Sequence, residues 1–158
     1  MQNPYASYLG NANPIEVISA TPARLAEFAQ KMGKEKVAKS PAPGKWSPRE
    51  IFCHLADCEI VFAYRLRQTL AEPNHVIQPF NQENWANTYA AYDAESALAL
   101  FSAARRWNLA MIQSVPRADH GKQVTHPERG TMTFATIFET MAGHDVNHLQ
   151  QLEKIAAA

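Results

Sequence analysis

Apolar residues recur every three or four positions along three long stretches that contain no proline, 49–72, 80–115 and 128–158. Such spacing is typical of amphipathic helices, because positions three and four apart share one helix face. An earlier stripe predicts a helix from Pro14 that kinks or restarts at Pro22 and ends at Gly33, followed by an extended loop to residue 46.

The expected helix starts carry capping signals. Ser47–Glu50 reads as a capping box with proline at the first helical position, Asp93 can cap the next long helix, and Thr131 or Thr133 can cap the last. Arg105 and Arg106 are expected to face solvent.

Residues 81–89 predict a short helix, and residues 116–131 a loop. No paired strand runs with hairpin turns are evident. The sequence therefore predicts an all-α fold, a four-helix bundle with an extra short helix, as one domain over residues 1–158.

The composition limits the kinds of binding partner that we expect for this protein. The chain has 15 basic and 15 acidic residues and no net charge, so we expect neither nucleic acid nor a membrane surface as a partner. There is no basic start followed by an apolar run, and no apolar run approaches the ~20 residues of a membrane span. The two cysteines, Cys53 and Cys58, would point to different faces of one helix, which excludes a disulfide framework and favours a cytoplasmic protein.

The histidines indicate candidate chemistry. His144 and His148 are four residues apart on the apolar stripe of the last helix, so both imidazoles can reach one metal ion. An isolated pair of this kind is more often a pair of core or surface histidines. His54 borders the apolar stripe of the helix that begins near residue 48 and is a candidate third ligand. Three nitrogens with an open position suit a catalytic zinc or nickel ion.

Four segments resemble, in chain order, the signatures of the DinB-like (YfiT-like) superfamily. They are KWSPREIFCHLAD at 45–57, FNQENWA at 80–86, HPERG at 126–130 and HDVNHLQQ at 144–151. The resemblance implies an up-down-down-up four-helix bundle, often a homodimer, and a divalent metal on residues that match His54, His144 and His148. One departure is Asn81, where the family frequently has an acidic residue.

Other residues allow two readings each. Cys58 is either a buried core residue or a fourth ligand that would close the site. Asp57 and Asn147 are placed to orient an imidazole, and Asp57 is the best candidate for a catalytic base. Arg65 is a candidate contact for an anionic substrate or cofactor, with a salt bridge as the alternative, and Trp85 is a candidate pocket wall.

Relatives implied by the resemblance include thiol-dependent transferases and proteins labelled metal-dependent hydrolases. The leading hypothesis is a metal-dependent S-transferase that uses a low-molecular-weight thiol on a small-molecule substrate. The alternatives are a metal-dependent hydrolase and a stress-linked metal- or ligand-binding protein without turnover, and fold alone does not choose among them.

Overall fold

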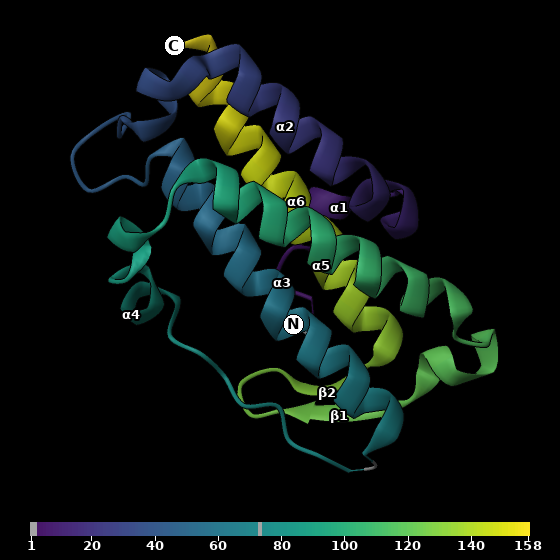
Figure 1. The fold of residues 1–158 in the computed structure, drawn as a ribbon. Coiled ribbons are helices and arrows are strands. Elements are labelled where there is room, and N and C mark those ends of the chain that lie inside the picture. Colours follow the sequence, from purple (N-terminus) through teal and green to yellow (C-terminus); the bar gives the residue numbers. More distant parts are fainter. Residues whose placement is uncertain (1–2, 73) are drawn as a thin grey trace.

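Four long helices lie side by side in the computed structural model, which describes residues 3–72 and 74–158 (Figure 1). They are α2 (Pro14–Ala38), α3 (Pro48–Ala71), α5 (Ala94–Ser114) and α6 (Phe134–Ala157). The predicted all-α four-helix bundle is therefore confirmed. No helix among the described residues is both long and apolar enough to cross a bilayer.

Several shorter elements complete the fold. They are α1 (Ala6–Leu9), α4 (Gln82–Ala86), two 3₁₀ turns at Tyr89–Ala91 and Arg117–Gly121, and the strands β1 (Gln123–His126) and β2 (Gly130–Thr133). The expected short helix at 81–89 is thus present as α4 and the first 3₁₀ turn.

The long helices follow an up-down-down-up order. Helices α2 and α6 run in the same direction, since Thr21 meets Asp145 midway along them and Lys36 meets the Ala156 carbonyl at their ends. Helices α3 and α5 run the other way, because the connection between them returns past the bundle before α5 begins (Figure 1). This topology brings α3 and α6 together as antiparallel neighbours.

The capping signals mark the helix starts as expected. The Ser47 amide donates to Glu50 Oε2 at 2.7 Å, which completes the capping box of α3. Asp93 accepts from the Ser96 amide at the start of α5, and Thr133 rather than Thr131 caps α6.

The first long helix breaks at Gly33, as predicted, but the segment directly after it is helical rather than the extended loop that was expected. The chain turns there, with φ 69° and ψ 169°, and then resumes a helical course to Ala38. Glycine adopts this conformation without the clash that a Cβ would cause. This second helical segment buries Val37 and places the Lys36 ammonium on the Ala156 carbonyl, so these contacts hold it against the bundle after the break.

The expected loop at 116–131 contains a small antiparallel hairpin. Strands β1 and β2 pair Val124 with Met132, and both of these side chains are buried. Four residues per strand are too few for alternation to stand out against a loop. The ribbon also holds the α3–α5 connection, because the Ile77 amide donates to the Thr125 carbonyl at 2.8 Å.

Arg105 was expected to face solvent, but it is 1 % exposed. Its guanidinium donates to Glu59 Oε2 at 2.8 and 3.0 Å and to Asp145 Oδ2 at 2.5 Å. It also donates to the Ile18 carbonyl at 3.0 Å. Pro22 has no N–H to offer that carbonyl four residues earlier, so Arg105 takes the place of a missing helical hydrogen bond. One side chain of α5 thereby joins α2, α3 and α6.

We expect Arg105→Gln to lower the free energy of unfolding by about 3–5 kcal/mol, because it leaves two buried carboxylates without their cation. Arg106→Gln, one position along on the exposed side of the same helix, should change it by less than about 0.5 kcal/mol. Urea unfolding of both variants checks this. Equal losses in the two variants would contradict a structural role for the buried arginine.

Candidate metal centre

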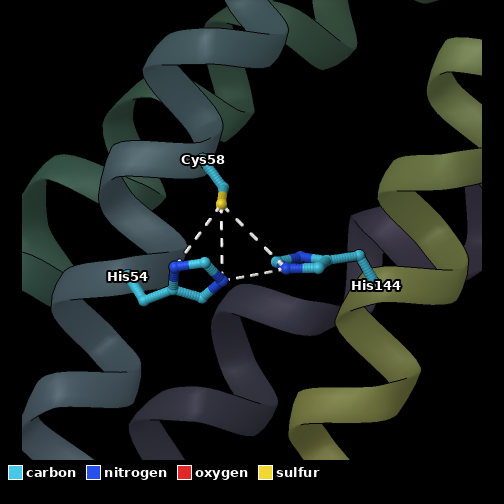
Figure 2. A group of neighbouring side chains, drawn as sticks. All are labelled: His54, Cys58 and His144. Carbon is cyan, nitrogen blue, oxygen red and sulfur yellow. Dashed lines mark hydrogen bonds between the residues drawn. The ribbon is translucent and has the colours of Figure 1, made fainter. Parts of the chain in front are cut away.

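Three imidazoles converge between α3 and α6 in the interior of the bundle. His54 Nε2 lies 3.0 Å from His144 Nε2, which lies 3.1 Å from His148 Nε2. None of the three side chains is more than 5 % exposed. Figure 2 shows His54 and His144 reaching toward each other from facing helices. The structure thus brings together the three histidines that the sequence singled out.

Helical periodicity and one close backbone approach position this cluster. The i, i+4 spacing places His144 and His148 on one face of α6, and the antiparallel neighbour α3 supplies His54. A Cβ at Gly143 would lie 2.7 Å from Tyr5 Cβ, so this glycine allows the N-terminal segment to approach α6 closely. The Tyr5 ring packs edge-on against His144, with ring centroids 5.1 Å apart.

Gln151 orients one imidazole. His148 Nδ1 donates to Gln151 Oε1 at 2.8 Å, so the neutral ring keeps the lone pair on Nε2, where it faces the other histidines. Asn147 was expected to have such a role, but no hydrogen bond joins it to a histidine in the described part of the chain. Gln151 could have been found from sequence, since it lies three residues after His148 on the same face.

Burial keeps the cluster uncharged. It lowers the pKa of His54 to about 3, with a further contribution from His148. The pKa of His144 is lowered well below its usual value, first by burial and then by its two histidine neighbours and Arg105. Burial also lowers the pKa of His148, although Gln151 and Asp145 oppose it. Neutral imidazoles with lone pairs are the form that binds metals.

Cys58 lies beside the cluster rather than elsewhere in the core. Its Sγ is 3.5 Å from His54 Nε2 and 4.0 Å from His144 Nε2, which places it within ligand reach of the same point (Figure 2). Burial raises the pKa of the thiol, and Asp57 adds to the rise. Without a metal, Cys58 therefore holds its proton at neutral pH.

Aromatic rings cover the outer sides of the cluster. Trp46 packs on His54 with centroids 4.9 Å apart, and Phe62 packs edge-on against His144 at 6.3 Å. Trp85 was the aromatic residue expected to line a pocket. Trp85, which belongs to α4, instead packs on Phe80 and is 39 % exposed.

A cavity of about 170 Å³ opens next to the histidines. His144 and Cys58 form its inner wall, and its remaining lining includes Arg65, His126 and Arg129. A larger hollow of about 480 Å³ lies at the end of the bundle, but none of the three histidines lines it. We therefore take the smaller cavity as the approach for a substrate.

The candidate base Asp57 forms no hydrogen bond with the three histidines in the described part of the chain. It is half-buried, burial raises its pKa, and the Tyr89 side chain opposes that rise by a hydrogen bond. Asp57 is also absent from the lining of the small cavity. Asn81 is the residue that departs from the acidic residue expected from the family resemblance. Its side-chain oxygen accepts a hydrogen bond from the Asn84 amide, so Asn81 caps α4.

The donor set fits a divalent metal ion. Two of the nitrogen pairs are 3.0 and 3.1 Å apart, and an ion about 2.0–2.1 Å from each nitrogen can stand between them. The tautomer of His148 leaves its Nε2 without a proton, and no carboxylate is hydrogen-bonded to the three rings among the described residues. The fold and the cluster together define a helical bundle with a candidate metal centre.

Comparisons with known proteins support this description. A family model described as the DinB superfamily matches residues 18–152, and the chain belongs to that superfamily. A protein of Oceanobacillus iheyensis named "Putative metal-dependent hydrolase" is 25 % identical over 142 residues, with 89 % of this chain and 83 % of the relative covered. A protein of the same name from Bacillus mycoides is also 25 % identical and covers 89 % and 82 %.

A solved structure has the same fold. YfiT from Bacillus subtilis, described as a probable metal-dependent hydrolase with an unusual four-helix bundle topology, aligns with a TM-score of 0.79 and 20 % identity. The alignment covers 89 % of this chain and 84 % of YfiT. The match to the family model confirms the superfamily that was inferred from the sequence signatures.

The metal-free protein should lose stability as the pH falls from about 6.5 toward 3. The histidines have lower pKa values folded than unfolded. The unfolded chain then binds more protons across this range, and unfolding is favoured on acidification. The loss should be on the order of a few kcal/mol. Urea unfolding at several pH values, compared with His54→Gln, measures it; an equal acid loss in the variant would contradict this origin.

Proposed function

We propose that this protein is a metal-dependent hydrolase. The observation that carries the proposal is the convergence of three neutral imidazole nitrogens beside a cavity of about 170 Å³. Relatives along most of the chain are named for such an activity. The adjacent cavity also favours turnover over a closed metal-binding module, because a substrate can reach the cluster.

The ligands of the metal are His54, His144 and His148. When bound, a divalent ion on three histidines with an open position acts as a Lewis acid and makes water nucleophilic near neutral pH. Cys58 stays a protonated neighbour in this proposal, since burial disfavours its thiolate. That leaves the position facing the cavity open. Zinc and nickel both suit such nitrogen donors.

The protein's own residues hold and enclose the centre. Gln151 fixes the ring of His148, and the rings of Trp46 and Tyr5 pack against His54 and His144. A buried, rigid set of ligands is what a catalytic centre requires.

Metal content tests the ligand set. His148→Ala should lose most of the bound zinc, at least about tenfold in affinity, because one of three donors is gone. Cys58→Ser should retain it. His75→Ala, outside the cluster, is the matched control. Elemental analysis after dialysis measures the content, and circular dichroism verifies the fold. Full zinc content in His148→Ala would refute this ligand set.

Activity tests the reaction class. Zinc- or nickel-loaded protein should hydrolyse an activated ester such as 4-nitrophenyl acetate on the order of 10²-fold faster than His148→Ala. The same protein is given 1-chloro-2,4-dinitrobenzene with and without a small thiol. Turnover of 1-chloro-2,4-dinitrobenzene only in the presence of the thiol, together with no hydrolysis of the ester, would contradict the hydrolase and support the S-transferase instead.

Further expectations from the sequence stay predictions. They are a homodimer, a cytoplasmic location, a small-molecule substrate, and thiol-dependent transfer with a low-molecular-weight thiol as the alternative activity.

A further inference from the structure

Two arginines from separate elements face the small cavity. Arg65 comes from α3, and Arg129 from the turn between β1 and β2. Neither forms a salt bridge within 4 Å in the described ranges, where the pairs found involve other cations. Glu128 is the only carboxylate in the cavity lining. The cavity therefore carries two positive charges against one negative charge.

Arg65 is incompletely satisfied. One Nη2–H donates to the Gln78 carbonyl at 3.2 Å, and the guanidinium lies 5.9 Å from the centre of the Phe80 ring. Its Nε–H is buried and has no hydrogen-bond partner among the residues that the structure describes. A buried donor without a partner is costly to the fold, which suggests that a ligand supplies the partner.

Keeping the Arg65 guanidinium charged also costs free energy. Burial, and after it the nearby Arg129, lower the pKa of Arg65 to about 10. The side chain is still charged at neutral pH. The fold thus keeps two like charges near each other in a partly buried place, where an anion would relieve both their repulsion and their desolvation.

His126 adds a donor to the same cavity. Its Nδ1 accepts a hydrogen bond from the Glu128 amide at 3.2 Å. Burial lowers the pKa of this histidine, so the ring is neutral and carries its proton on Nε2. The ring is therefore a donor at Nε2, not a base.

We propose that Arg65 and Arg129 form a subsite that binds a carboxylate of the substrate, next to the histidine cluster. The inference rests on the proposed hydrolase function and adds the class of substrate: a small carboxylic acid with a hydrolysable bond close to its carboxylate. His144 and Cys58 line the same cavity, so a bound carboxylate holds the neighbouring carbonyl group close to the metal ligands.

Charge and shape favour a carboxylate over a phosphate. In the metal-free protein, a cavity with one net positive charge matches one carboxylate, whereas a phosphate carries up to two negative charges. Guanidinium groups bind the planar carboxylate through paired N–H donors. The volume of about 170 Å³ also leaves room for only a small acid.

Binding to the metal-free and the zinc-loaded protein tests the subsite. We expect benzoate to bind both forms, and its uncharged analogue benzamide to bind at least about tenfold more weakly. In the wild type, benzoate should shift the Nε–H resonance of Arg65 and raise the melting temperature. Arg65→Gln and Arg129→Gln should each weaken benzoate binding at least about tenfold, whereas the exposed control Arg106→Gln should not change it.

Stability separates this role from a structural one. If the arginines serve a ligand, Arg65→Gln should keep or raise the melting temperature of the ligand-free protein, because a strained charge is removed. Equal binding of benzoate and benzamide, tighter binding of inorganic phosphate, or an unchanged affinity in both variants would overturn the proposal. The metal-free measurement needs no turnover, so failure of the hydrolase proposal would not imitate any of these results.

Discussion

The buried guanidinium of Arg105 is the constraint on which the rest of the bundle depends. It is bonded to Glu59 on α3 and Asp145 on α6, and it also accounts for the carbonyl that Pro22 leaves free on α2. Burial alone would lower its pKa, but the two carboxylates outweigh that effect and raise it. A charge cluster of this kind tolerates little displacement, because its hydrogen bonds compensate for a large desolvation cost. The relative rotation of the helices is thereby fixed.

The same cluster sets the geometry of the candidate centre. Glu59 follows Cys58 in α3, and Asp145 follows His144 in α6, so each helix has an ion-cluster residue directly beside a residue of the centre. Successive residues point about 100° apart around a helix. Fixing the rotation of α3 and α6 through their carboxylates therefore aims the thiol and the imidazoles at one point. Stability and ligand geometry come from neighbouring faces of the same two helices.

Much of this could be predicted from sequence, since local signals determined it. Capping residues gave the helix starts, and the i, i+4 histidines and His54 were placed on core faces by helical periodicity alone. What failed depended on partners distant in the chain. The sequence around Arg105 is that of a surface residue, because its partners Glu59 and Asp145 come from other helices. Nothing in the sequence near Tyr5 indicates that it contacts Gly143. The hairpin was missed because its strands are short, and Cys58 was ambiguous because helical spacing allowed both a core residue and a ligand.

X-ray absorption spectroscopy of the zinc-loaded protein tests the central claim most directly, because it reports the atoms bound to the ion itself. The account predicts three imidazole nitrogens at about 2.0–2.1 Å, with the remaining shell made of light atoms. Cys58→Ser should then give the same spectrum. A sulfur neighbour at about 2.3 Å, lost in that variant, would show a closed site and contradict the open catalytic centre.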